Sequence, residues 1–94
     1  MTYEIRIDVE AAEFIESQDQ KTQKIIKENL QKLEQEPYPS PQAQKGDREK
    51  VTINGEEIYR MHISRSYTAF YIIKKKQIIV TDIVDIDTAH KMYD

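Results

Sequence analysis

The chain has 94 residues, of which 33% are charged and 38% apolar, and its net charge is −3 at pH 7. This length leaves room for one hydrophobic core, so we expect a single domain over residues 1–94. The absence of cysteine excludes a disulfide framework and a thiolate metal site, and it favours the reducing cytoplasm. The chain shows neither the basic and apolar segments of a signal peptide nor an apolar run long enough to span a membrane, so we expect no membrane partner.

The N-terminal part predicts one strand followed by two helices. Residues 3–9 alternate apolar and polar side chains, which is the period of a half-buried strand. Residues 10–17 and 20–36 place apolar side chains at helical spacing, and Asp19 is positioned to cap the second helix. Because the two helices are joined so closely, they should turn back on each other as a helical hairpin.

The C-terminal part predicts an antiparallel meander sheet. Prolines at 37, 39 and 41 end the second helix and start a loop that runs to about residue 46. Asn54-Gly55 is the dipeptide that most favours a two-residue hairpin turn, and Lys74-Lys75-Lys76 marks a later turn. Strands are therefore expected at residues 48–53, 56–64, 67–73 and 77–86.

A short helical turn capped by Asp87 should end the chain. The predicted order is thus an N-terminal strand, a helical hairpin, the antiparallel meander and the C-terminal helical turn. This order indicates the α+β fold class.

Two side chains on the expected strand 56–64 are candidates for chemistry. The period of two places Arg60 and His62 on one face and Tyr59, Met61 and Ile63 on the other. A cation beside an imidazole could hold a phosphate and move a proton, as RNA cleavage without a metal requires. The polar outer face of a half-buried strand explains the same pattern.

Three further residues could extend this candidate catalytic site. Arg65 lies in the turn that follows the strand, close enough to join the same surface. His90 and Tyr93 are three residues apart and share one face of the last helical turn, so either could transfer a proton. A single histidine near a chain end can equally be structural.

Positive charge is concentrated in the middle of the chain. Residues 45–76 contain eight Lys or Arg against four Asp or Glu, whereas residues 10–36 and 77–94 are each net negative. This asymmetry suggests an anionic partner, although a solvated lysine-rich turn explains almost as much. The candidate RNA-binding residues are Lys45, Arg48, Lys50, Lys74 and Lys75.

Several familiar motifs are missing from the sequence. It has no Gly-rich phosphate loop, no paired-histidine zinc motif and no serine-nucleophile context, so nucleotide hydrolysis, metalloproteolysis and serine catalysis have no support. Asp82, Asp85 and Asp87 alternate and could bind a hard cation, but a solvated strand face explains them more simply. We expect no metal and no cofactor.

The chain resembles the RelE/ParE toxin superfamily. Residues 55–63 and 66–71, GEEIYRMHI and SYTAFY, are similar to its basic two-strand signature: Tyr-Arg/Lys-x-Arg/Lys, a turn, then Tyr-Arg-x-x-Tyr. The Leu30-x-x-Leu33-x-x-x-Pro37 helix ending and the terminal His90-x-x-Tyr93 are also similar. The resemblance therefore covers nearly the whole chain.

The resemblance implies a RelE-like fold and the toxin of a toxin–antitoxin pair. Such toxins either cleave messenger RNA on the ribosome or poison DNA gyrase, so a cognate antitoxin, the ribosome and mRNA are the implied partners. Arg60 and His62 fall where RelE-like enzymes hold the scissile phosphate. Tyr93, or His90, falls where the residue that transfers a proton is expected.

Two positions depart from the family pattern. Thr68 stands where the family commonly has arginine, and Arg65 is the nearest substitute. Asp87 stands near another basic position, which leaves only Lys91 nearby.

We predict a metal-independent endoribonuclease that acts on translated mRNA. Two alternatives stay open: a non-enzymatic toxin that binds gyrase, and an inactive toxin-fold protein that only binds a partner. The basic and titratable side chains of the candidate site favour the enzyme, whereas Thr68 and the pI of about 5.4 favour a binding protein. The oligomeric state stays open.

Overall fold

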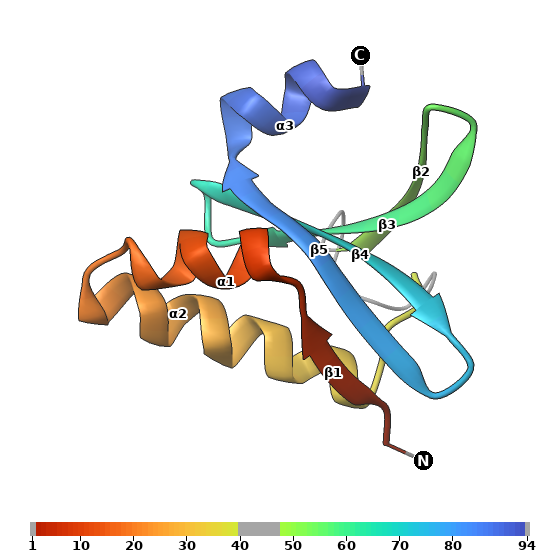
Figure 1. Ribbon diagram of the computed structural model, residues 1–94, viewed down its shortest axis with the longest axis horizontal. Helices are drawn as coiled ribbons and strands as arrows, with labels where there is room; N and C mark the ends of the chain where they lie inside the picture. Colours follow the sequence, from red (N-terminus) through yellow and green to blue (C-terminus); the bar gives the residue numbers. More distant parts are fainter. Residues whose placement is uncertain (1, 40–47, 94) are drawn as a thin grey trace.

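A five-stranded sheet with helices on both faces forms the protein (Figure 1). The computed structural model describes residues 2–39 and 48–93, except for the side chains of His90, Met92 and Tyr93; the predicted loop after α2 lies outside it from residue 40 on. The elements in chain order are β1 (Glu4–Ile7), α1 (Val9–Glu16), α2 (Gln20–Gln31), the 3₁₀ helix η1 (Lys32–Glu34), β2 (Arg48–Ile53), β3 (Glu56–Ile63), β4 (Tyr67–Lys74), β5 (Gln77–Asp85) and α3 (Ile86–Tyr93). In the described part of the chain no helix is long and apolar enough to cross a membrane.

The sheet is mixed, with strand order β1-β5-β4-β3-β2. Strands β2 to β5 form the predicted antiparallel meander, which confirms the α+β fold class. Strand β1 adds a parallel pair with β5, in which Glu4 lies opposite Gln77 and Ile7 opposite Val80. Helices α1 and α2 cover one face of this sheet, and α3 lies over the opposite face (Figure 1).

The hairpin turns follow the predicted chemistry. Asn54 and Gly55 have φ values of 52° and 81°, the left-handed conformation that a two-residue turn of this kind requires. Lys75, with φ 55°, turns β4 into β5, so β4 extends one residue further than predicted. The Asn54-Gly55 turn therefore sets the register of β2 on β3.

Aspartate side chains cap the starts of α2 and α3, but the cap of α3 differs from the prediction. Asp19 Oδ1 accepts a hydrogen bond of 2.8 Å from the Thr22 amide, as expected for the start of α2. At α3 the cap is Asp85, whose Oδ1 accepts from the Thr88 amide at 2.8 Å, and this bond lowers the pKa of Asp85. The prediction that Asp87 is the cap was wrong, because the helix begins at Ile86, two residues before the start that a cap at Asp87 implies. The helix has eight residues instead of a single turn.

The main core lies between the sheet and helices α1 and α2. Its largest buried side chains come from one face of α2 and η1 and from alternate positions of β3, β4 and β5, as their periods require. These residues are Ile26, Leu30, Leu33, Met61, Ile63, Tyr71, Ile78 and Val80.

A row of tyrosines fastens the segment after η1 to this core. Tyr71 is buried, stacks on Tyr59 at a centroid distance of 5.7 Å, and donates a hydrogen bond of 2.5 Å to the Pro37 carbonyl.

Tyr71→Phe leaves that buried carbonyl without this donor, so we expect it to lower the free energy of unfolding by about 1–2 kcal/mol. Urea denaturation measures the change. Tyr38→Phe, at a ring that is 49% exposed, is the control, and equal effects of the two changes would contradict the prediction.

Candidate functional site

Arg60 and His62 lie on the sheet face that points away from α1 and α2. Their neighbours Met61 and Ile63 are fully buried in the main core, so alternation directs Arg60 and His62 to the other side. Cross-strand partners share a face, and the register places Glu49 and Phe70 beside Arg60, and Thr68 beside His62. We call the surface formed by Glu49, Arg60, His62, Thr68 and Phe70 the α3 face.

Helix α3 covers this face. Phe70 is 1% exposed and Thr68 and Ala89 are fully buried, although the first two point away from the main core. The helix contacts β5 and β4 on one side of β3 and β2 on the other, so it lies on the same side of the sheet as Arg60 and His62. His90 and Tyr93 belong to this helix, but their side chains lie outside the described residues, so only their place along the helix is known.

Arg60 forms an ion pair with Glu49 on the neighbouring strand. Its Nε donates to Glu49 Oε2 at 3.1 Å, and its Nη2 contacts the same oxygen. The Arg60 side chain is 14% exposed and that of Glu49 is 49% exposed. The sequence analysis did not predict the Glu49 carboxylate beside Arg60. Counting residues outward from the Asn54-Gly55 turn would have placed positions 49 and 60 opposite each other.

Thr68 occupies the position where the superfamily commonly has arginine. The residue is fully buried, and its Oγ1 has no hydrogen-bond partner among the residues that the structure describes. A threonine covered in this way cannot contact a bound phosphate. Arg65 is exposed in the β3–β4 turn, where the Ser66 carbonyl accepts a bond of 2.9 Å from the first amide of α3.

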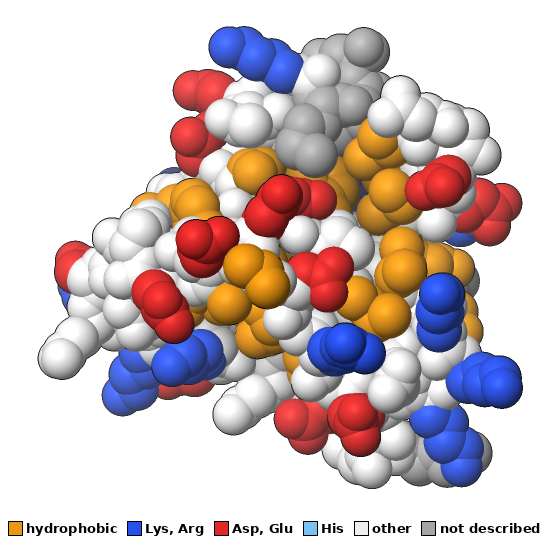
Figure 2. All heavy atoms as spheres, in the orientation of Figure 1, with side chains coloured by type: hydrophobic (Ala, Val, Ile, Leu, Met, Phe, Trp, Pro, Cys, Tyr) orange, Lys and Arg blue, Asp and Glu red, His pale blue; other side chains and the backbone are white. Residues whose placement is uncertain are grey.

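The predicted RNA-binding residues do not gather on the α3 face. Arg48 and Lys50 lie opposite Met61 and Tyr59, so the register directs them toward the side of α1 and α2, and Lys50 pairs with Glu57 at 3.2 Å. Lys74 and Lys75 are exposed at the tip of the β4–β5 hairpin, where Figure 2 shows Lys and Arg side chains together at the lower right. Lys45 lies outside the described residues.

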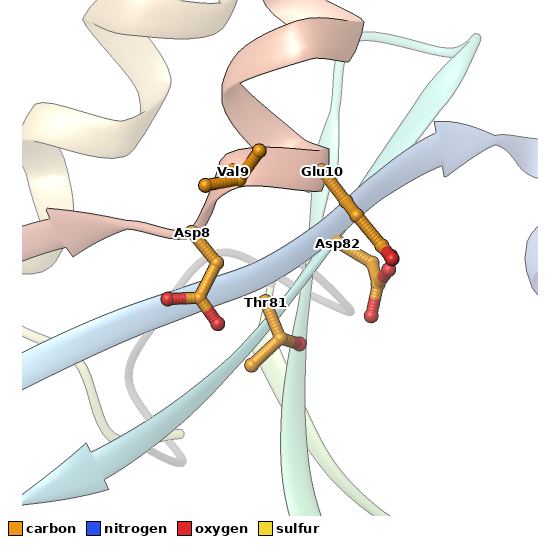
Figure 3. A pocket seen from close by; sticks show the side chains of 5 residues that line it. All are labelled: Asp8, Val9, Glu10, Thr81 and Asp82. Carbon is orange, nitrogen blue, oxygen red and sulfur yellow. The ribbon is translucent and has the colours of Figure 1, made fainter.

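The alternating aspartates near the C-terminus do not converge either. Asp82 lines a shallow pocket together with Asp8, Val9, Glu10 and Thr81 (Figure 3). Asp85 instead caps α3, and Asp87 is exposed in the first turn of that helix. In the described ranges, no three or more His, Asp or Glu side chains are grouped so that they could hold a metal ion.

The protein thus has a mixed sheet with a helical hairpin on one face and a C-terminal helix on the other. Residues 5–93 match the family model described as the ParE toxin of the type II toxin–antitoxin system parDE. The chain belongs to the ParE toxin family. This match confirms the resemblance to the RelE/ParE toxin superfamily, because it covers nearly the whole sequence.

Solved toxin structures share the fold of this ParE-family toxin. A chain of the archaeal RelE–RelB complex from Pyrococcus horikoshii OT3 is 24% identical with a TM-score of 0.70, and the match covers 90% of this chain and 96% of that one. The YoeB dimer from Staphylococcus aureus is 20% identical with a TM-score of 0.65, over 87% and 94% of the two chains. The E. coli RelBE complex is 18% identical with a TM-score of 0.56, over 86% and 93%. A comparison with curated proteins found no significant match.

Proposed function

We propose that this toxin inhibits growth and that a cognate antitoxin protein binds and neutralises it. Membership of a type II toxin–antitoxin family supports this proposal. Two of the similar structures are complexes whose names pair RelE with RelB. A short adjacent reading frame with a DNA-binding start and an amphipathic end would encode the antitoxin, and its coexpression is expected to restore growth.

The α3 face supports mRNA cleavage on the ribosome as the toxic activity, and we propose this function first. The observation that supports it is that α3, the helix of His90 and Tyr93, lies over the sheet face of Arg60 and His62. Residues from two parts of the chain that are distant in sequence, β3 and α3, thus lie on the same side of the sheet.

The proposed reaction needs only the RNA and protein side chains. The ribose 2′-hydroxyl gives its proton to the His62 imidazole and attacks the adjacent phosphorus, the bond from phosphorus to the 5′ oxygen breaks, and that oxygen takes a proton from Tyr93 or His90. The products are a 2′,3′-cyclic phosphate and a 5′-hydroxyl. Arg60 and His62 would stabilise the negative phosphorane, and Tyr93 or His90 would protonate the leaving oxygen.

A second candidate function is binding of a protein target such as DNA gyrase, without cleavage. The Arg60–Glu49 ion pair favours it, and so does the neutral threonine at position 68 where the superfamily commonly has arginine, because both reduce the positive charge available to RNA on the α3 face. Expression without the antitoxin separates the two candidates. Cuts with 5′-hydroxyl ends inside reading frames support the nuclease, whereas intact mRNA with lost DNA supercoiling supports the gyrase ligand. Normal growth would contradict both.

Cleavage is expected to persist when transition metals are removed. The attacking group in the proposed reaction is the ribose hydroxyl, and the positive charge comes from side chains. Purified toxin can be assayed on programmed ribosomes with phenanthroline, which removes zinc, manganese and iron but leaves the magnesium that ribosomes need. The rate should stay within about twofold of the untreated sample, a change of less than 1 kcal/mol in the barrier. Loss of cleavage that added zinc restores would overturn this prediction.

A further inference from the structure

The β2–β3 hairpin holds a carboxylate against the guanidinium that the proposed nuclease uses. Nε and Nη2 form one edge of the Arg60 guanidinium, and both contact Glu49 Oε2. The Asn54-Gly55 turn sets the register, so the backbone itself places the two residues opposite each other. The same guanidinium edge is suited to phosphate oxygens, because carboxylate and phosphate present similar acceptor geometry.

We propose that Glu49 is an internal competitor for phosphate at Arg60. Its carboxylate occupies the Nε and Nη2 edge in the free toxin and moves away when an RNA phosphate binds there. This inference rests on the proposed nuclease function, because it concerns the same guanidinium. Glu49 does not touch the reacting atoms and acts only through Arg60.

The different exposures of the two side chains determine which of them moves. Arg60 is 14% exposed and lies on the same face as its cross-strand partner, the almost fully buried Phe70, so its position is restricted. Glu49 is 49% exposed on the edge strand β2 and can turn into solvent without disturbing the core. Glu49 is therefore the movable member of the pair.

Glu49 should compete only weakly with phosphate at Arg60, and a weak competitor discriminates between RNA and small anions. A partly exposed ion pair lowers the affinity for a competing anion by roughly two- to fivefold. A phosphate in an RNA chain has neighbouring contacts that offset this loss, whereas a free nucleotide or inorganic phosphate has few. The carboxylate would thus make the site prefer polymeric RNA to small anions.

The test compares Glu49→Gln with Glu57→Gln. Both changes remove one negative charge from the same hairpin, but Glu57 pairs with Lys50 at 3.2 Å and lies toward the opposite face of the sheet. The probe is a short 2′-O-methylated RNA, which cannot be cleaved, and the readout is the NMR shift of the Arg60 Nε–H group. Glu49→Gln is expected to bind roughly two- to fivefold more tightly than the wild type, and Glu57→Gln to bind like the wild type.

Other results would overturn the inference. Equal affinities of the two variants would show that the effect is one of net charge, and weaker binding by Glu49→Gln would show that the carboxylate holds Arg60 in its binding position. Glu49→Ala serves as a second variant if thermal unfolding shows that the glutamine protein is not folded. The readout does not depend on cleavage, so tighter binding by Glu49→Gln together with intact cellular mRNA would refute the nuclease and keep the inference. A silent Arg60 signal in every variant would refute the inference.

Discussion

Arg60→Ala is expected to lower mRNA cleavage about 10²- to 10³-fold and to release cells from growth arrest. In the proposed nuclease the Arg60 guanidinium stabilises the negative charge that develops on the phosphate. A group with this role contributes most in the transition state. The loss should therefore appear mainly in the rate of the chemical step. Single-turnover cleavage of ribosome-bound mRNA measures it.

Two other substitutions make this result interpretable. Arg6→Ala removes an exposed arginine from β1, at the opposite edge of the sheet from β2, and it should leave cleavage unchanged. Arg60→Lys keeps the charge but loses the planar pair of donors, so an intermediate rate is expected. Urea denaturation checks that Arg60→Ala is folded. A folded Arg60→Ala protein that cleaves at the wild-type rate would place the activity elsewhere on the molecule.

Local sequence patterns were sufficient to predict most of the fold. Alternation and the Asn54-Gly55 turn predicted the meander, and Asp19 predicted the start of α2. The parallel pairing of β1 with β5 was not predicted, because alternation shows that a segment is a strand but not which strand it pairs with. The cap at α3 was misplaced for a related reason. Asp85 and Asp87 have the same chemistry, and the choice depends on where β5 ends.

The sequence could predict only those features of the candidate site that lie within a single strand. The period of two assigned Arg60 and His62 to one face, but the Glu49 partner requires the register of the next strand. The burial of Thr68 requires the path of α3, which depends on packing between residues distant in sequence. The positive charge of residues 45–76 was visible in the sequence, but its distribution over different surfaces was not.

Phe70→Ala is expected to lower the free energy of unfolding by about 3–5 kcal/mol and to loosen α3. Phe70 is 1% exposed yet lies on the face opposite the main core, so its ring packs under α3, which contacts β4. Removing the ring leaves a cavity between the helix and the sheet. Urea denaturation measures the stability, and hydrogen exchange of the α3 amides measures the loosening.

Phe14→Ala separates loosening of α3 from general destabilisation. Phe14 is half-buried on α1, contacts Tyr67 edge to face at 5.7 Å, and belongs to the opposite face of the sheet. Loss of the Phe14 ring should lower the free energy of unfolding of the whole protein. Hydrogen exchange of the α3 amides should then rise only as much as that of the other amides. If the proposed proton donors act from α3, Phe70→Ala should also slow cleavage under conditions where both variants are folded, because the donors are no longer held over Arg60 and His62. The two variants could cleave at the same rate although hydrogen exchange of α3 rises only in Phe70→Ala. Catalysis would then not need the docked helix, and the proton donor would have to come from the sheet.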